Sequence, residues 1–171
     1  LEIHHDGDLP KQSGLGTSSA FAVGLLNTLH ALRGHMAAPM QLAKEAIRVE
    51  RDLCRENVGS QDQAAVAFGG LNHITFSAGD AITVRPVTLR QERLALLESH
   101  LMLFFTGFSR TASDIAAEQI RNIPSTTAEL TALQALPGEG LRLLSGDTDI
   151  RGFGKLLDEA WRIKRSLSSR I

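Results

Sequence analysis

The stretch that decides the fold reads Ser13-Gly14-Leu15-Gly16-Thr17-Ser18-Ser19-Ala20. Its two glycines permit a tight turn with positive φ angles, because no Cβ atom obstructs the backbone. The hydroxyl residues that follow favour the start of a helix, where Ser and Thr are common capping residues. An apolar segment then continues to about residue 33, which predicts a buried helix that ends at Gly34.

The junction between this turn and the helix has the properties of an anion-binding site. The first turn of a helix presents backbone N–H groups without partners, and the helix dipole is positive there. Phosphate groups bind at such positions, and nearby hydroxyls can ligate a metal ion that accompanies the phosphate. The alternative is an ordinary loop and a capped helix, since residues 13–20 match neither the Walker pattern nor the dinucleotide fingerprint.

A second helix is predicted over residues 39 to 55, and it carries a carboxylate on its apolar stripe. Ala43, Ile47 and Cys54 define the stripe, and Glu50 falls between the last two at helical spacing. A carboxylate on a buried face costs several kcal/mol unless it is paired or binds a cation. Glu50 is therefore paired with a nearby arginine, or lies at a stripe edge that reaches water, or ligates a cation.

Another carboxylate, Asp62, lies near the predicted start of a short helix that ends before Gly69-Gly70. One interpretation is that Asp62 only caps this helix, which is a common use of Asp. The other combines it with the loop and with Glu50. A phosphoryl transferase needs a cradle for phosphates, oxygen ligands for Mg²⁺, and a group that accepts or orients the acceptor hydroxyl, and these three features supply those parts.

The same segments resemble the GHMP kinases, whose phosphate loop reads Pro-x-x-x-Gly-Leu-Gly-Ser-Ser-Ala. Residues 10–20 match this pattern with Thr17 for the first serine and one extra serine before Ala20, and residues 59–63 resemble the family's Gly-x-x-Asp-Gln. The resemblance implies an ATP-dependent kinase with Mg²⁺ and a two-lobed α+β fold. Residues 1–88 would form the ATP-binding lobe with the loop, helices and a β-hairpin, and residues 99–171 a partial, helix-rich second lobe.

The resemblance also implies a role for each matching residue. Asp62 would be the catalytic base, and Ser18 and Glu50 would ligate Mg²⁺. The residues expected around the ATP phosphates are Ser13, Gly14, Leu15, Gly16, Thr17, Ser18 and Ser19.

Further parts of the chain are predicted from local pattern. Residues 71–84 read as a β-hairpin, and the continuous apolar run at 101–105 reads as a buried strand. Helices are predicted at about 126–136, before Pro137, and at about 150–168. The loop after the apolar run is a second candidate anion site, and its residues expected to hold the substrate phosphate are Thr106, Gly107, Ser109 and Arg110. The alternative for Arg110 is a solvated loop arginine.

Within the GHMP kinases the chain is most similar to the D-glycero-D-manno-heptose 7-phosphate kinases, through residues 105–112 and 153–168 among others. This similarity implies transfer of the γ-phosphoryl group of ATP to the anomeric hydroxyl of heptose 7-phosphate, which gives the 1,7-bisphosphate. The alternatives are another acceptor, such as fucose, galactose or homoserine, and a non-catalytic nucleotide- or sugar-binding fragment. The family's first and last motifs lie outside these residues, so we expect a chain truncated at both ends.

The composition limits the partners. The 171 residues are 43% hydrophobic and carry a formal net charge of −1, with no basic tract for nucleic acid and no apolar run long enough to span a membrane. The single cysteine, Cys54, cannot form an internal disulfide, which indicates a cytoplasmic location. We therefore expect small-molecule partners, namely ATP and a sugar phosphate.

Overall fold

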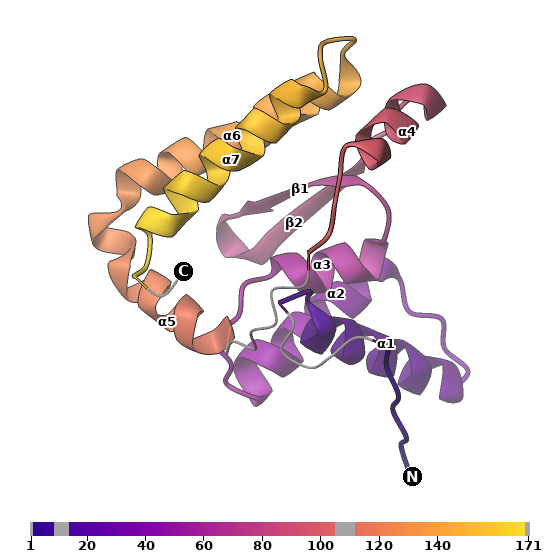
Figure 1. Cartoon of the computed structure of the whole chain (residues 1–171). Helices are drawn as coiled ribbons and strands as arrows, with labels where there is room; N and C mark the ends of the chain where they lie inside the picture. The colour runs from indigo at the N-terminus through magenta and orange to yellow at the C-terminus, as the bar shows by residue number, and fades with distance from the viewer. Residues whose placement is uncertain (1, 9–13, 105–111, 170–171) are drawn as a thin grey trace. The chain divides into compact units, whose positions relative to one another are not determined.

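The computed structural model describes residues 2–8, 14–104 and 112–169. Contacts divide the chain into two compact units, and the main division falls between Gly69 and Gly70. The unit before it is helical in its described part, and the unit after it combines a β-hairpin with helices (Figure 1). The expected α+β class is confirmed.

The first unit is a cluster of packed helices: α1 (Thr17–Leu32), α2 (Pro39–Ile47), the π-helical turn η1 (Arg48–Leu53) and α3 (Gln61–Phe68). Its hydrophobic core gathers Val23 of α1 with Leu42 and Ala46 of α2. Ala46 and Ala64 have no exposed surface, so small side chains let α2 and α3 pack closely. This packing fixes the starts of α1 and α3 relative to η1.

Helix α1 ends as predicted, since its C-cap is Arg33 and Gly34 follows with a φ of 71°. Its start differs from the prediction. The N-cap is Gly16, which has a φ of 70° and, because it has no side chain, makes no side-chain capping bond. The serine hydroxyls expected to cap α1 bind a side chain of η1 instead.

The predicted regular helix over residues 39–55 is wrong in its second half. From Arg48 the chain forms the π-helical turn, in which the N–H of Cys54 donates to the carbonyl oxygen of Val49 at 2.9 Å. The wider turn ends the apolar stripe at Glu50, so Leu53 is 65% exposed and Cys54 is exposed as well. Such turns are rare and are frequently found at functional sites.

A hydrogen-bonded pair joins α1 to α2. Nε2 of His30, in the last turn of α1, lies 2.7 Å from Oε2 of Glu45, and Nε2 of Gln41 donates to Oε1 of Glu45 at 2.9 Å. A carboxylate only accepts, so the proton of the imidazole in this contact is on Nε2. The pKa of Glu45 is lowered from its ordinary value. The hydrogen bond from His30 is the main cause, and the hydrogen bond from Gln41 is the next.

This lowered pKa predicts an acid-sensitive contribution to folding. A carboxyl group whose pKa is lower in the folded state stabilises the fold above its unfolded pKa, and the contribution disappears as pH falls through the folded value. We expect Glu45→Gln to lower the free energy of unfolding at pH 7 by less than about 1 kcal/mol. The Glu45 side chain is 35% exposed, so solvent screens its interaction with His30. Urea denaturation at pH 7 and pH 3 measures the free energy of unfolding of both proteins.

The same pair supplies the control. His30→Gln removes the principal donor, so its stability deficit should likewise shrink between pH 7 and pH 3. A Glu45→Gln deficit that stays constant over this range would contradict the linkage.

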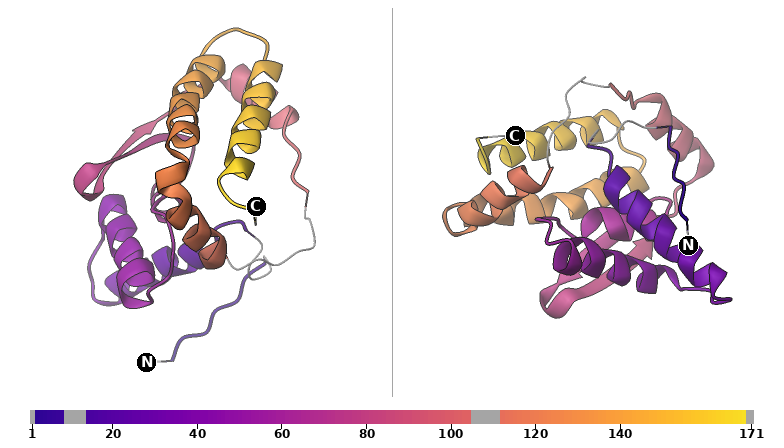
Figure 2. Two further views of the ribbon diagram at one scale, coloured as in Figure 1. Left: turned by 90° about the vertical axis from the view of Figure 1, so that its left-hand side faces the viewer. Right: turned by 90° about the horizontal axis from the view of Figure 1, so that it is seen from below.

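The second unit begins with an antiparallel hairpin of β1 (Asn72–Ser77) and β2 (Ala81–Pro86), joined by the short turn η2 (Ala78–Asp80). The register pairs Asn72 with Pro86 and Ser77 with Ala81, as expected for the predicted hairpin. The remaining elements are α4 (Gln91–Ser99), α5 (Ala112–Asn122), η3 (Ile123–Ser125), α6 (Thr127–Ser145) and α7 (Arg151–Ser166). Helices α6 and α7 lie side by side in every view (Figure 2).

Helix α6 continues through Pro137, so the predicted end before that residue is wrong. Its packing on α7 explains the difference. A Cβ atom at Gly140 would lie 3.4 Å from side-chain atoms of both Phe153 and Leu156, so the two helices approach closely here. This packing offsets the hydrogen bond that proline cannot form.

A buried arginine of α4 closes the end of α6. Arg93 is 8% exposed, and its Nε and Nη2 donate to the carbonyl oxygens of Leu144 and Leu143 at 3.2 and 2.6 Å. The last carbonyls of a helix lack partners within it, and the dipole there favours a cation. Arg93 therefore anchors α4 to α6 next to the core of Leu97, Leu144 and Ile150.

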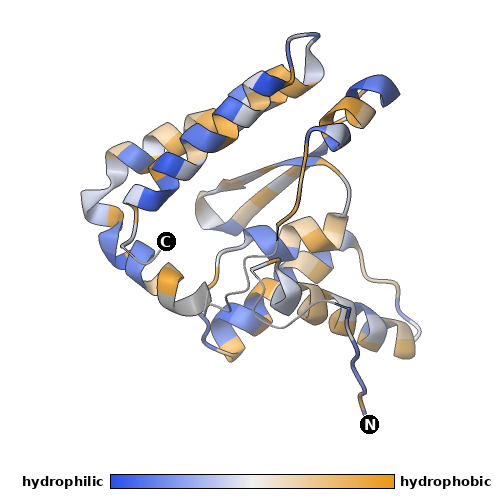
Figure 3. Cartoon of the chain, viewed as in Figure 1, coloured by the Kyte–Doolittle hydropathy of each residue, from blue (hydrophilic) through white to orange (hydrophobic). Residues whose placement is uncertain are grey.

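The apolar run predicted as a buried strand is wrong over its described residues. Residues 101–104 form no strand, and their side chains are 54–82% exposed. Figure 3 shows the apolar colour along this extended segment, which follows α4. Local composition predicted the extended backbone, whereas burial depends on neighbours that this segment lacks among the described residues. No described helix is long and apolar enough to cross a membrane.

Candidate functional site

Three hydrogen-bond donors converge on the buried carboxylate of Glu50. Glu50 is only 5% exposed. Its Oε1 accepts from Ser18 Oγ at 2.6 Å, and its Oε2 accepts from Ser19 Oγ at 2.9 Å and from Gln63 Nε2 at 2.5 Å. The start of α1, the π-helical turn and the first turn of α3 therefore meet at one side chain.

Two of the three explanations for Glu50 from sequence do not hold within the described part of the chain. No lysine or arginine there forms an ion pair with Glu50, although Arg51 follows it directly and pairs with Asp52. Its burial excludes a stripe edge that reaches water. The three donors are neutral, so no described cationic side chain compensates a carboxylate at this buried position, and of the three interpretations the cation ligand is the one left.

The oxygen atoms at this position suit Mg²⁺. Ser18 Oγ and Glu50 Oε1 lie 2.6 Å apart, and a hydroxyl and a carboxylate oxygen are donors of the kind that would hold Mg²⁺. No group of three or more His, Cys, Asp or Glu residues that could hold a metal occurs among the described residues. Proteins usually bind Mg²⁺ through one or two carboxylates together with substrate phosphates.

The start of α1 has free backbone donors beside this carboxylate. Gly14 and Gly16 have φ angles of 75° and 70°, so the turn takes the positive-φ conformation that the sequence predicted. The N–H of Ala20 is the first to make a helical bond, to the Gly16 carbonyl oxygen at 2.9 Å. The N–H groups of the preceding first turn have no side-chain cap among the described residues, and phosphate groups bind at helix starts of this kind.

The carboxylate of Asp62 lies against the same turn. A Cβ atom at Gly16 would stand 3.3 Å from Oδ2 of Asp62. Asp62 is the second residue of α3, whose N-cap is Ser60, and no side-chain capping bond occurs there. The capping interpretation of Asp62 therefore fails, and its exposed carboxylate is directed to the loop where phosphates would bind.

Gly16 thus has two reasons to be glycine, and they can be separated by mutation. Gly16→Ala should lower the free energy of unfolding by about 1–2 kcal/mol for the positive φ. It should also weaken ATP binding, because the new methyl displaces Asp62 or the turn. Urea denaturation and ATP titration measure the two effects.

Gly34→Ala is the matched control for this prediction. Gly34 lies outside the turn and has a φ of 71°, but a Cβ atom added there would meet no atom of the described residues within 4 Å, its chain neighbours aside. The control should therefore lose stability and keep its affinity for ATP. An equal loss of ATP affinity in the two variants would contradict a specific role for the contact between Gly16 and Asp62.

The structure brings together eight of the sequence-predicted site residues in the first unit, and it adds one. The eight are Gly14, Leu15, Gly16, Thr17, Ser18, Ser19, Glu50 and Asp62. The sequence did not single out Gln63, although it belongs to the Gly-x-x-Asp-Gln pattern. Ser13 and the four residues expected to hold the substrate phosphate, Thr106, Gly107, Ser109 and Arg110, lie outside the described residues.

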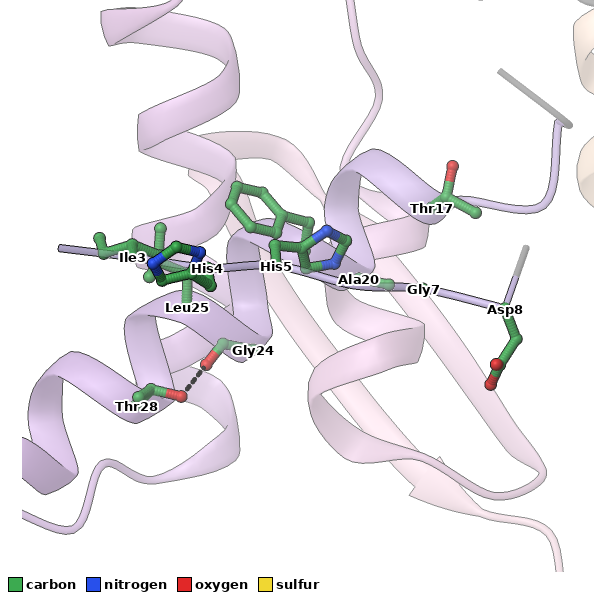
Figure 4. A pocket seen from close by; sticks show the side chains of 11 residues that line it. Ile3, His4, His5, Gly7, Asp8, Thr17, Ala20, Gly24, Leu25 and Thr28 are labelled. Atoms are coloured by element: carbon green, nitrogen blue, oxygen red, sulfur yellow. Dashed lines mark hydrogen bonds between the residues drawn. The ribbon is translucent and has the colours of Figure 1, made fainter. Parts of the chain in front are cut away.

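A recess of about 520 Å³ adjoins the turn along α1 (Figure 4). It is lined by the extended segment around His4 and His5 and by Thr17, Phe21 and Leu25 of α1. The ring of His5 stands edge-on to that of Phe21, with centroids 4.7 Å apart. Neither Glu50 nor Asp62 lines this recess.

Comparisons with known proteins agree with this arrangement. Residues 1–70 match the GHMP kinases N terminal domain. The chain is 28% identical over 170 residues to D-glycero-alpha-D-manno-heptose 7-phosphate kinase of Campylobacter jejuni, covering 98% of this chain and 50% of that protein. It is 32% identical over 117 residues to galactokinase of Pyrococcus furiosus, covering 67% of this chain and 31% of that protein.

A solved structure shows the same fold. The crystal structure of a D-glycero-D-manno-heptose 1-phosphate kinase from Bacteriodes thetaiotaomicron matches with a TM-score of 0.61 and 27% identity, over 92% of this chain and 46% of that one. The Campylobacter jejuni relative and the solved structure each match most of this chain, and the chain spans about half the length of each. Residues 1–70 are a GHMP kinase N-terminal domain, in a chain that is similar over most of its length to heptose-phosphate kinases.

Proposed function

We propose that the protein is an ATP-dependent kinase that phosphorylates the anomeric hydroxyl of D-glycero-D-manno-heptose 7-phosphate. The observation that carries the proposal is the convergence of the α1 N-terminus, the Ser18–Glu50 oxygen pair and the Asp62 carboxylate within one unit. Phosphoryl transfer is catalysed mainly by positioning and charge stabilisation, and these three features supply both. The similarity to heptose-phosphate kinases over most of the chain supports the choice of acceptor.

Each group has a distinct task in this reaction. The N–H groups at the start of α1 bind the ATP phosphates through the turn from Gly14 to Ser19. Ser18 and Glu50 supply oxygen ligands for Mg²⁺, which when bound neutralises charge on the phosphates. Asp62 accepts the proton of the sugar hydroxyl as that oxygen forms its bond to the γ-phosphorus. The bond between the γ-phosphorus and the bridging oxygen breaks, and ADP leaves.

The remaining parts of the proposal follow from the sequence. Thr106, Gly107, Ser109 and Arg110 would bind the phosphate already present on the substrate. Residues 1–88 would act as the ATP-binding lobe and residues 99–171 as part of the second lobe. A kinase that uses ATP and a sugar phosphate would work in the cytoplasm, where both are available.

An ADP-release assay with MgATP and heptose 7-phosphate tests the proposal. We expect release that depends on the sugar and a product phosphorylated at the anomeric position, identified by ³¹P NMR. Galactose and fucose belong in the same screen, since galactokinases and a fucokinase are among the relatives. ADP release with galactose or fucose and none with the heptose would show that the acceptor is a different sugar. ATP binding without ADP release for any sugar would favour a non-catalytic binding module.

A further inference from the structure

Gln63 is the most completely enclosed large side chain of the described residues. It is 1% exposed, and its Nε2 donates to Oε2 of Glu50. Its own Oε1 is buried and has no hydrogen-bond partner among the described residues. The orientation of the amide follows from chemistry, because a carboxylate only accepts and so requires the NH₂ group on its side.

The two oxygen atoms of Glu50 therefore differ in their surroundings. Oε2 accepts two hydrogen bonds, from Ser19 and Gln63, whereas Oε1 accepts one, from Ser18. A carboxylate oxygen has about two lone-pair sites, so Oε2 is saturated and Oε1 keeps one site free. The free site lies beside the hydroxyl of Ser18, which is also an oxygen ligand.

We propose that Gln63, together with Ser19, is a positioning residue that holds Oε2 of Glu50 and so reserves Oε1 for a divalent cation shared with Ser18. The proposal rests on the kinase function proposed above. It gives Gln63 no contact with substrate or with the reacting atoms. Partners that orient a metal ligand in this way commonly determine metal affinity and activity.

The orphaned Oε1 of Gln63 argues against a role in stability alone. A buried amide with one unsatisfied acceptor is costly, and an apolar side chain of similar size would avoid that cost. Such a side chain could not donate to Glu50. The amide is therefore explained by what its Nε2 does for the carboxylate.

The position of Gln63 also links the two carboxylates of the site. Asp62 and Gln63 are consecutive in the first turn of α3. The Asp62 carboxylate lies against Gly16 of the turn, and the Gln63 amide lies against Glu50. One helix start thus places both the proton acceptor and the orienting group of the metal ligand.

Binding of Mn²⁺, as a probe for Mg²⁺, tests the positioning role. The purified full chain is titrated with Mn²⁺ in the presence of a non-hydrolysable ATP analogue, and protein-bound Mn²⁺ is followed by its EPR line shape. We expect Gln63→Met to raise the Kd for Mn²⁺ about 10- to 100-fold. Its affinity for the analogue in EDTA should stay unchanged, which a merely damaged fold would not produce. Gln61→Met is the matched control, since Gln61 is an exposed glutamine two residues away.

The outcomes separate the two proposals. An unchanged Kd for Mn²⁺ in folded Gln63→Met overturns the positioning role and leaves the kinase proposal intact. If Gln63→Met does not fold, Ser19→Ala, which removes the other donor to Oε2, decides in the same way. Wild-type protein that binds neither analogue nor Mn²⁺ overturns the kinase proposal, and the positioning role with it.

Discussion

Replacement of Asp62 by Asn is expected to lower sugar-dependent ADP release by about 10²–10⁴-fold, the usual contribution of a positioned general base. Asn has the same shape but cannot accept the proton of the sugar hydroxyl. Because the side chain beside Gly16 keeps its size, the loss should be in kcat rather than in ATP affinity. Single-turnover kinetics and ATP titration measure the two quantities.

The anomeric hydroxyl is more acidic than an ordinary alcohol, which places the expected loss toward the lower end of this range. Asp52→Asn is the control, because Asp52 is a half-exposed carboxylate of η1 that pairs with Arg51 outside the cluster. Turnover within twofold of wild type in Asp62→Asn would remove Asp62 from the mechanism.

Glu50→Gln is expected to raise the Mg²⁺ concentration that half-saturates activity by at least about tenfold, and to lower kcat as well. The substitution keeps the size of the side chain but removes the one negative charge that the cluster holds in its buried part. An amide can also present its NH₂ group to the ion, which a carboxylate never does. A Mg²⁺ titration of ADP release measures the change.

A stability measurement keeps this result interpretable. The three donors to Glu50 can still bond to an amide oxygen in part, so the variant should fold, and urea denaturation verifies this. Glu56→Gln, at an exposed position after η1, is the control and should leave the Mg²⁺ titration unchanged. A folded Glu50→Gln variant with the wild-type Mg²⁺ dependence would show that Glu50 is not a ligand.

The two predictions distinguish the parts of the cluster. Asp62 is exposed and faces the phosphate turn, so its loss should act on the chemical step. Glu50 is buried and bonded to Ser18, so its loss should act on the ion. If Asp62→Asn instead changed the Mg²⁺ dependence and Glu50→Gln changed only the chemical step, the assignment of base and ligand would be reversed.

Features that depend on neighbours in the sequence were predictable from the sequence alone. The turn at Gly14 and Gly16 requires positive φ angles, which glycine permits, and Gly34 ends α1 for the same reason. The β-hairpin follows from the alternation of its strands and the turn between them. The position of Glu50 on an apolar stripe predicted its burial, because the helix is regular up to Ile47.

Features that depend on distant neighbours were decided by the tertiary structure. Ser18 and Glu50 are 32 residues apart, and which hydroxyl meets which carboxylate oxygen follows from the packing of α1 on α2 and η1. The π-helical turn that ends the stripe, and the passage of α6 through Pro137, both oppose local propensity. Helix propensity is worth at most a few kcal/mol at such positions, so packing between helices can outweigh it.

The sequence by itself therefore determined the turn at Gly14 and Gly16, the helix that follows it and the presence of two candidate carboxylates. The tertiary structure decided that these carboxylates have different surroundings, one exposed beside Gly16 and one buried under Ser18, Ser19 and Gln63. The physical reason is that burial and hydrogen bonding belong to pairs of residues from separate helices. A pattern along one helix contains no information about the residue that will face it.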